Sequence, residues 1–477
     1  MKNEPSPAVP SVAEEFANAD LGDARRTGRL RIIAESWSAA PDQGVPTASK
    51  SSAKTEATYR FLNNPGVTYA PIVDAHIEQT RARVAEAGIA IVAHDTTEFA
   101  FGGEVPRTGL GRLKGGDQGF LGHLALAISA EGRRRPLGIL GFAPWVRSEM
   151  RRRKKANGRK KSGSDYAKET GKESARWGEM VAEVSGRVGA SLIHVMDREA
   201  DAYPLLWQLV EGRHRFVVRV SKDRVVQAAD SEQPTELLSQ ALCRAEGLCE
   251  IEVPLSRRAS SSIPAKRRTF GPREARVARL QIAVGEVRVQ KPRYETGLPK
   301  WLDLNVVHVR EIDAPEGTDE VDWKLYTTEP IGTMAAVRTV IEHYRARWLI
   351  EEFFKALKTG CAVEKRQHES LHALLNAVAI CLPIAWNLLL LRNRARSTPE
   401  APATEVLTRT QIEVLRTCAP MKLDDRPTVR QVLFAVAALG GHLKSNGDPG
   451  WQVLGCGMQY LLTLETGWLA GRQRSDR

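Results

Sequence analysis

The sequence predicts an α/β fold whose central part combines strands and helices, with a mostly β insertion and helical regions at both ends. Three observations predict this fold. Short apolar runs separated by tight turns indicate an antiparallel meander in the first half of the chain. Amphipathic helical patterns alternate with further strand-like runs after the meander. Both ends of the chain carry helical patterns without such runs.

The composition is that of a multidomain globular protein with a polyanionic partner. The chain has 477 residues, of which 42% are hydrophobic, so several domains with sizeable cores are expected. Lys and Arg number 69 against 57 Asp and Glu, and the net charge of +12 favours polyanions through counterion release. Residues 1–15 lack the apolar core of a signal peptide. The six cysteines form no CxxC pair, so we expect reduced thiols in an intracellular protein.

The first 70 residues predict short helices that carry several cations. Such a small helical unit suits contact with the DNA backbone, and we interpret residues 1–70 as a DNA-binding domain. A solvated helix face would show the same pattern, and both interpretations stay open. The candidate DNA contacts are Arg25, Arg26, Arg29 and Arg60.

The predicted catalytic domain, residues 71–365, begins with three apolar runs joined by short turns. A helix, a strand, a second helix and a final strand are expected to follow. This order is that of the RNase H-like fold, the retroviral-integrase type, in which the first and fourth strands lie side by side. The strand-like runs are 89–93, 121–130, 137–142, 192–196 and 215–220, and the helices are 174–188 and a segment from about 201.

Two aspartates follow strand-like runs. Asp95 comes after the first run and Asp197 directly after the fourth. Because carboxylates at the ends of adjacent strands come together, we expect these two side chains to share a site. Nearby, Asp201 is interpreted as the N-cap of the following helix. His94 is interpreted as a packing residue, with metal contact as the alternative.

Residues 222–328 predict a mostly β insertion within the catalytic domain. Their strand-like runs are separated by linkers rich in Arg, Ser and Pro. An earlier basic stretch, residues 151–161, either follows DNA or forms a solvated loop. The strand-like runs of the insertion are 280–284, 286–289, 304–309 and 323–326.

Residues 331–358 are predicted to be helical, and the polar side chains of this segment gather on one face. At 100° per residue, four functional groups fall within an arc of about 60°. One face can therefore pack on a sheet, while the other presents a carboxylate flanked by a phenol and two cations. The functional face carries Tyr344, Arg347, Glu351 and Lys358, and the apolar face carries Leu349, Ile350, Phe353 and Leu357.

Asp95, Asp197 and Glu351 are the candidate catalytic residues and metal ligands. Phosphoryl transfer on DNA develops negative charge on the attacking and leaving oxygens, which two cations about 4 Å apart stabilise. Magnesium prefers oxygen ligands, so we expect two Mg²⁺ ions per site, which Mn²⁺ can replace. Arg binds phosphate bidentately and Lys binds it as a point charge. The candidate DNA- and phosphate-binding residues are Tyr344, Arg347, Lys358, Trp323 and Arg219.

The same residues carry a family resemblance. The spacing of Tyr344, Arg347, Glu351 and Lys358 matches the Y-x2-R-x3-E-x6-K signature of the insertion-sequence-four family of bacterial transposases. The DREAD segment from Asp197 to Asp201 and the HDTT segment from His94 to Thr97 resemble that family's aspartate motifs. Two further segments resemble that family's N-terminal DNA-binding domain. They are LGDARR, residues 21–26, and YRF, residues 59–61.

The resemblance implies a magnesium-dependent cut-and-paste reaction on double-stranded DNA. Water nicks the transposon end, the freed 3′-hydroxyl forms a hairpin, a second water opens it, and the 3′-hydroxyl joins target DNA. The implied partners are inverted-repeat ends, target DNA and a second copy in the synaptic complex, where each protomer cuts the end that its partner mainly binds. Residues 366–477 would form a helical dimerisation domain. The implied location is the bacterial cytosol, near the nucleoid, without a membrane.

Two residue assignments depend on this comparison or on local pattern. Trp323 matches the position where relatives stack a flipped base, and a core tryptophan remains the alternative. The apolar run at residues 373–391 approaches membrane-spanning length, but it contains Asn376, Pro383 and Asn387. We therefore expect a buried helix there.

Two other functions compete with transposition. A structure-specific nuclease on the same core would cut DNA without joining it. An inactive transposase relic would bind DNA without chemistry. The phosphate-binding helix argues against the first, and the intact set of three carboxylates argues against the second.

Overall fold

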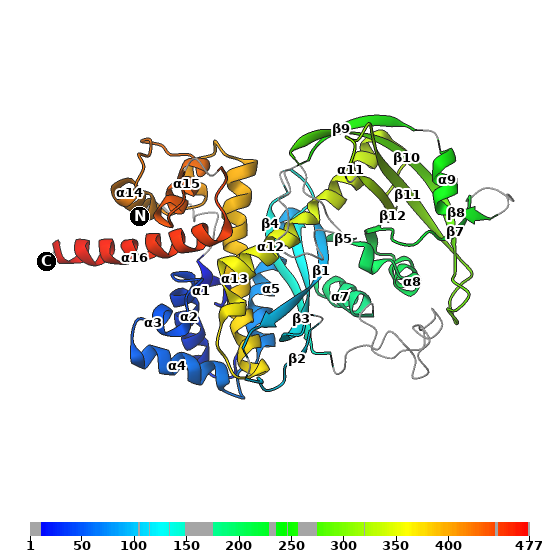
Figure 1. The fold of residues 1–477 in the computed structure, drawn as a ribbon. Helices are drawn as coiled ribbons and strands as arrows, with labels where there is room; N and C mark the ends of the chain where they lie inside the picture. The colour runs from blue at the N-terminus through cyan, green and yellow to red at the C-terminus, as the bar shows by residue number, and fades with distance from the viewer. Residues whose placement is uncertain are drawn as a thin grey trace. The chain divides into compact units, whose positions relative to one another are not determined.

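The computed structural model describes residues 11–475 except 104, 114, 133, 148–174, 229–234, 246, 256–273, 319 and 444–446. The basic stretch at residues 151–161 lies outside the described residues. The chain divides into two compact units. Figure 1 labels their helices and strands. Unit 1 comprises Met1–Arg151, Glu183–Ser191 and Trp348–Arg477, and unit 2 comprises Arg152–Ala182 and Leu192–Arg347.

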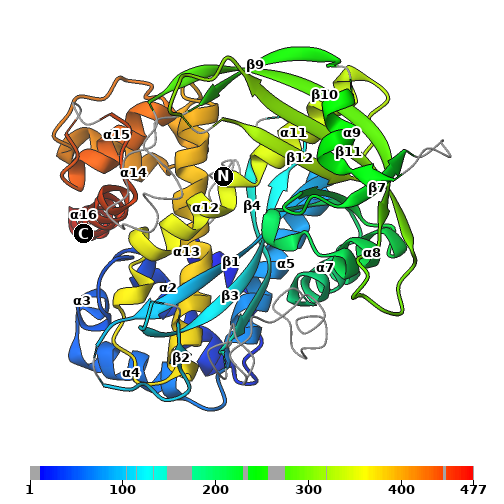
Figure 2. The same ribbon diagram turned by 45° about the vertical axis from the view of Figure 1, so that its right-hand side comes forward.

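Unit 1 contains an antiparallel meander and most of the helices. Strand β3 pairs with β1 on one side and with β4 on the other, and β1 and β3 run side by side in Figure 2. The strands are β1 (Ile89–Phe101), β2 (Gly111–Arg112), β3 (Gln118–Ser129) and β4 (Pro136–Trp145). The first helices are α1 (Val12–Glu15), α2 (Ala24–Ser38), α3 (Val45–Ser49), α4 (Ser52–Asn63) and α5 (Tyr69–Ala87). The later helical segments are α12 (Trp348–Lys355), η2 (Ala356–Gly360), η3 (Val363–Lys365), α13 (Leu371–Ser397), η4 (Ala403–Glu405), α14 (Arg409–Cys418), α15 (Val429–Leu439) and α16 (Trp451–Ser475).

Unit 2 is built on a mixed sheet. Strand β5 pairs in parallel with β6. Strands β12, β11 and β10 follow in that order, and each is antiparallel to the strand before it. Strands β7 and β9 both pair with β10, and β8 pairs with β7. The strands are β5 (Ser191–Met196), β6 (Arg215–Arg219), β7 (Val225–Ala228), β8 (Glu236–Leu237), β9 (Cys249–Leu255), β10 (Arg276–Gln290), β11 (Trp301–Ile312) and β12 (Asp322–Thr327). The helical segments are α7 (Ala175–Arg187), which extends into unit 1, η1 (Arg198–Ala200), α8 (Tyr203–Glu211), α9 (Leu238–Arg244) and α11 (Met334–Ala346).

The predicted element order is confirmed. The antiparallel strands β1, β3 and β4 are followed by helix α7, strand β5, helix α8 and strand β6, as the alternating patterns indicated, and the two-residue strand β2 was not predicted. Among its described residues the insertion is mostly β, although its first two predicted runs form the single strand β10 and it also contains α9, β7, β8 and β9. Its last strand, β12, pairs with β6, so the insertion extends the sheet of unit 2.

The long apolar helix α13 is a core helix in this structure. By length and composition it could cross a membrane, but 89% of its apolar window is buried inside the protein. Asn376 is fully buried and its side-chain amide donates to the carbonyls of Leu62 and Val67. A buried amide needs such partners, so this contact fits a protein interior. The expectation of a buried helix is confirmed.

A buried ionic network ties α1 to α5. The Glu15 carboxylate is 1% exposed and accepts hydrogen bonds from His76 Nδ1 at 2.5 Å and from Arg83 at 2.7 and 3.1 Å. His76 Nε2 lies 3.1 Å from the Ile139 amide, which can only donate. Near neutral pH His76 is therefore uncharged with its proton on Nδ1, and burial lowers its pKa below 6.5, so it carries positive charge only in acid. Burial alone would raise the pKa of Glu15, but hydrogen bonds and charge from its two partners lower it to about 2.

We predict that this network makes unit 1 lose stability in acid. The unfolded chain protonates His76 near pH 6.5 and Glu15 near pH 4.5, before the folded chain does. Stability should therefore decline as the pH falls below 6.5, and again between 4.5 and 2. Glu15→Gln should lower stability by about 3 kcal/mol at pH 7, and its deficit against wild type should shrink between pH 4.5 and 3. Thermal unfolding at a series of pH values measures the stability of both proteins, and Glu35→Gln, at an exposed glutamate, serves as the control. A deficit that does not change with pH would contradict the prediction.

Helices α15 and α16 pack through glycines. A Cβ added at Gly457 would lie 1.8 Å from the Val436 carbonyl oxygen, whereas one at Gly467 would meet nothing within 4 Å. Gly457→Ala should therefore destabilise unit 1 by about 1–3 kcal/mol. Gly467→Ala, in the same helix, should be neutral or stabilise by up to about 1 kcal/mol. Urea denaturation of both variants tests the prediction, and equal effects would show that the two helices do not pack this closely.

Candidate active site

Asp95 lies in the middle of β1 on unit 1. Its half-buried carboxylate accepts a hydrogen bond from the Thr96 backbone amide at 2.8 Å. The prediction that Asp95 ends a strand is wrong, because β1 continues to Phe101 in register with β3. The Thr and Phe residues that follow Asp95 favour extended backbone, and each lies opposite a residue of β3 in the antiparallel ladder. The preceding His94 is fully buried and stacks on His123, which fits its interpretation as a packing residue.

Asp197 directly follows β5, so the predicted strand end is confirmed. Its Oδ1 accepts from the Glu199 backbone amide at 2.8 Å and caps the short helix η1. The side chain is half-buried, which leaves part of the carboxylate accessible. The capping contact fixes the orientation of the carboxylate at the end of the strand.

Asp201 has a different role from the one predicted. The N-cap of α8 is Ala202, and Asp201 is 2% exposed. Its carboxylate accepts from the amides of Ser221 and Lys222 at 2.8 and 2.9 Å and pairs with Arg224 at 2.6 Å. The interpretation as an N-cap was therefore wrong. The chain turns after η1 so that this carboxylate meets the segment after β6, a contact that local spacing does not indicate.

The predicted helix over residues 331–358 is interrupted. Helix α11 ends at Ala346, α12 begins at Trp348, and a π-helical turn covers Ala356–Gly360. The prediction that residues 331–358 are helical is largely confirmed, since helix covers 334–346 and 348–360. The α-helical wheel did not anticipate the break at Arg347 or the π-helical turn, in which the Cys361 amide donates to the Ala356 carbonyl.

The four residues of the signature consequently fall on different elements. Tyr344 and Arg347 belong to unit 2, and Glu351 and Lys358 belong to unit 1. The expected apolar side of this helical segment is confirmed at Ile350 and Phe353 of α12 and at Leu357 of η2, which are buried, whereas Leu349 is only half-buried. Glu351 and Lys358 are half-buried. Helix α12 packs against β1, the strand that carries Asp95.

Lys358 is held at β1. Its ammonium donates to the Glu98 carbonyl, forms an ion pair with Glu364 at 3.1 Å, and lies 5.5 Å from the centre of the Phe99 ring. Glu364 is a residue that the sequence prediction missed. It stands six positions after Lys358, a spacing at which two side chains do not meet on an α-helix, so no periodicity pointed to it.

Three of the predicted DNA-binding residues come together in unit 2. The half-buried Trp323 ring meets the buried Tyr344 ring edge-on, with centroids 5.4 Å apart. Arg219 lies on the adjacent strand β6 and donates to the Asp322 carbonyl at 3.1 Å. Tyr344 therefore packs beneath Trp323, and the expected exposed phenol is not found.

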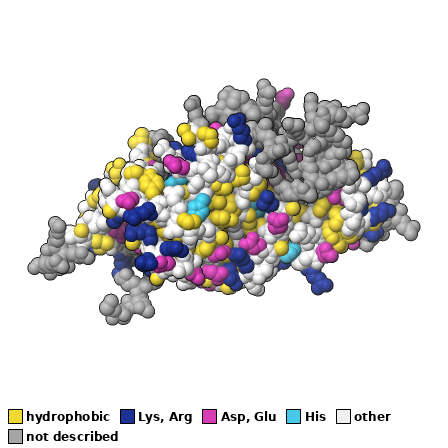
Figure 3. Space-filling model, turned by 90° about the horizontal axis from the view of Figure 1, so that it is seen from below, with side chains coloured by type: hydrophobic (Ala, Val, Ile, Leu, Met, Phe, Trp, Pro, Cys, Tyr) yellow, Lys and Arg dark blue, Asp and Glu magenta, His cyan; other side chains and the backbone are white. Residues whose placement is uncertain are grey.

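The N-terminal cations divide into two kinds. Arg25 and Arg60 are exposed, with side chains 92% and 74% accessible, and each pairs with an acidic residue of its own segment. Arg26 is half-buried and donates to the carbonyls of Leu21 and Gly66, which gives it a structural role. Arg29 is half-buried on α2. On the face in Figure 3, described basic and acidic side chains are interspersed, so the excess positive charge does not form one field there.

The three candidate carboxylates are divided between the two units but share their donor chemistry. Among the described residues, no group of three or more His, Cys, Asp or Glu side chains that could hold a metal ion is found. Asp95 and Glu351 belong to unit 1 and Asp197 to unit 2. The donor chemistry nevertheless suits a hard divalent cation, since all three groups are half-buried carboxylates.

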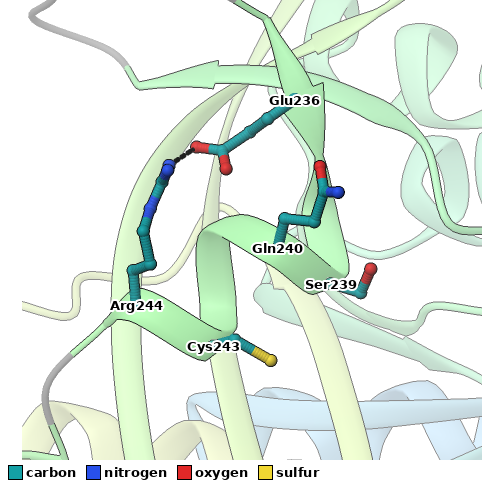
Figure 4. Close-up of a pocket in the computed structure, with 5 residues that line it drawn as sticks. All are labelled: Glu236, Ser239, Gln240, Cys243 and Arg244. Carbon is teal, nitrogen blue, oxygen red and sulfur yellow. Dashed lines mark hydrogen bonds and ion pairs between the residues drawn. The ribbon is translucent and has the colours of Figure 1, made fainter.

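A shallow pocket of about 510 Å³ lies elsewhere, at α9 and β8 of unit 2. Figure 4 shows its lining, in which Arg244 pairs with Glu236. No predicted site residue lines it, so it does not locate the chemistry. Its lining residues are Glu236, Ser239, Gln240, Cys243 and Arg244.

Comparison with known proteins identifies the family. A family described as "Transposase DNA-binding" matches residues 10–67, and one described as "Transposase DDE domain" matches residues 136–388, which include Asp197 and Glu351 but begin after Asp95. A solved structure, the piggyBac transposase synaptic complex with hairpin DNA, is 11% identical with a TM-score of 0.30. The aligned region covers 72% of this chain and 55% of the piggyBac chain, so this chain spans about half the length of that protein. Because the match to the transposase DDE domain covers more than half of this chain, the chain belongs to the DDE transposase family.

Proposed function

We propose that this protein is a cut-and-paste DNA transposase of the insertion-sequence-four type, working in the bacterial cytosol. The observation that carries the proposal is the match of residues 136–388 to the transposase DDE domain. Within that range Tyr344, Arg347, Glu351 and Lys358 follow the four-residue signature at its full spacing. The match of residues 10–67 to a transposase DNA-binding domain supports DNA as the partner.

In this proposal Asp95, Asp197 and Glu351 hold two magnesium ions. The bound ions supply activation of the attacking water and neutralisation of charge on the leaving oxygen. The chain itself orients the carboxylates: the Thr96 amide holds Asp95, the Glu199 amide holds Asp197, and the packing of α12 on β1 directs the helix that bears Glu351. Fixed ligands reduce the reorganisation needed when the phosphate arrives.

The proposed reaction proceeds through nicking, hairpin formation, hairpin opening and strand transfer, within a homodimer that pairs two transposon ends. Arg347 and Lys358 neutralise phosphate charge in these steps, with Arg219 as a further contact. The exposed Arg25 and Arg60 of the N-terminal helices contribute backbone contacts to the end DNA.

A strand-transfer assay tests the function against its alternatives. Full-length protein is incubated with Mg²⁺ and a plasmid that carries its gene with the native flanking DNA, and the products are resolved on denaturing gels. A transposase yields nicks, hairpin ends and joined products, all abolished by EDTA. Cleavage without joined products would identify a nuclease, and DNA binding without any cleavage would identify an inactive relic.

We predict that Trp323→Ala impairs hairpin formation more than the first nick. Loss of one stacked base costs about 1–3 kcal/mol, or about 5- to 150-fold in the hairpin step. Trp323→Phe should retain most of the rate because it keeps an aromatic face. Trp301→Ala, at another tryptophan of the same sheet, serves as control. Quenched-flow analysis separates the steps, and equal losses in both would assign Trp323 a purely structural role against Tyr344.

A further inference from the structure

The chain between Lys358 and Glu364 reverses direction through unusual backbone conformations. The π-helical turn Ala356–Gly360 carries Lys358, and the buried Ala362 follows with φ 47° and ψ 38°. A non-glycine residue in the left-handed region costs about 1–3 kcal/mol and persists where the surrounding structure holds it. The short helix η3 then places Glu364 back beside Lys358.

One oxygen of Glu364 joins two elements. Its Oε1 accepts the Ala100 backbone amide of β1 at 3.0 Å and contacts Lys358 Nζ at 3.1 Å. The Glu364 and Lys358 side chains are 29% and 25% exposed, so both are largely shielded from water. The bond to Ala100 anchors the carboxylate to the sheet, and the anchored carboxylate in turn restrains a long flexible side chain.

The hydrogen-bond count at Lys358 leaves room for one more acceptor. An ammonium has three N–H donors, and here one faces the Glu98 carbonyl and one faces Glu364. Among the residues that the structure describes, no further acceptor is seen at the third donor, which can therefore meet an acceptor arriving from solvent. A lysine loses about 2 kcal/mol of side-chain entropy when it is fixed, and two protein acceptors remove much of that loss before DNA binds.

We infer that Glu364 is a positioning residue that holds the Lys358 ammonium ready for a DNA phosphate. The inference rests on the proposed function, because it takes Lys358 as a phosphate-binding residue. Glu364 would act through Lys358 and not on DNA, because its negative carboxylate repels a phosphate and its Oε1 is bonded to β1. This role differs from that of an autoinhibitory carboxylate, which would pair with the lysine in the free protein and dissociate from it when DNA binds.

A labelling experiment tests the contact without using activity. Full-length protein is acetylated with N-hydroxysuccinimidyl acetate, and the modification of Lys358 is quantified by mass spectrometry relative to the exposed Lys355. Glu364→Ala should raise Lys358 labelling severalfold, because the ammonium loses its anchored partner. Glu405→Ala, which removes a comparable ion pair with Arg394 in the same unit, should leave it unchanged. Unchanged labelling in Glu364→Ala overturns the inference.

A kinetic experiment tests the positioning role. Glu364→Ala should slow nicking at saturating DNA by about 10- to 100-fold, as misplaced supporting groups do, while the Kd for DNA changes little. Glu364→Gln should recover much of the rate, because its amide oxygen can accept both hydrogen bonds. In a Lys358→Met background, Glu364→Ala should cause no further loss.

The outcomes separate the inference from the proposed function. Additive losses with Lys358→Met, or faster nicking or tighter DNA binding by Glu364→Ala, overturn the positioning role. Raised labelling in Glu364→Ala together with a wild-type protein that never nicks DNA would refute the proposed function and leave the contact intact. The positioning role is also contradicted if Glu364→Ala has a lower melting temperature and Glu364→Gln does not recover the nicking rate.

Discussion

Asp197→Asn and Glu351→Gln are each expected to eliminate magnesium-dependent nicking while the protein remains folded. Both substitutions keep the size of the side chain and remove its negative charge. Asn can still accept the Glu199 amide, so the cap of η1 should survive. Groups that only support a metal ligand already contribute about 10- to 100-fold, so loss of a ligand should cost about a thousandfold or more.

The measurement is single-turnover nicking of end DNA over a range of Mg²⁺ concentrations, with circular dichroism as a check of folding. Glu352→Gln is the matched control, because Glu352 adjoins Glu351 but pairs with Arg396 at 2.8 Å. Asp95→Asn extends the test to the aspartate that lies outside the matched DDE domain. Nicking that persists in any of the three variants would remove that residue from the metal site.

Asp201→Ala is expected to destabilise unit 2 by about 3–5 kcal/mol. Removal of one partner of a buried ion pair leaves the other charge uncompensated, and Arg224 is only 6% exposed. The amides of Ser221 and Lys222 also lose their acceptor. The neighbouring Asp223 makes comparable bonds to Ser239 at the surface, so Asp223→Ala should cost much less.

Thermal denaturation measures this loss, and activity distinguishes it from a catalytic effect. Asp201→Ala should nick DNA at low temperature, where unit 2 remains folded, and lose activity on warming. Asp197→Asn should be inactive at every temperature. If Asp201→Ala melts like wild type, the buried pair does not stabilise the unit. If it is inactive while folded, Asp201 acts directly in the chemistry.

The contrast between Asp197 and Asp95 shows how far sequence patterns reach. An apolar run followed by a polar residue predicted the end of β5, and Asp197 stands there. The same reasoning was wrong at Asp95, because the length of β1 depends on β3 residues 118–123, more than twenty positions away in the sequence. Local periodicity carries no information about how far such a partner extends.

The sequence by itself determined the order of strands and helices, the buried side of the helical segment at Ile350, Phe353 and Leu357, and the burial of α13. Each of these features follows from the period of apolar residues along a single element. Only the tertiary structure decided that Asp201 meets Arg224, that Tyr344 packs under Trp323, and that Glu364 returns to Lys358. These contacts join residues on separate elements, so their energies depend on a chain path that residue spacing does not encode.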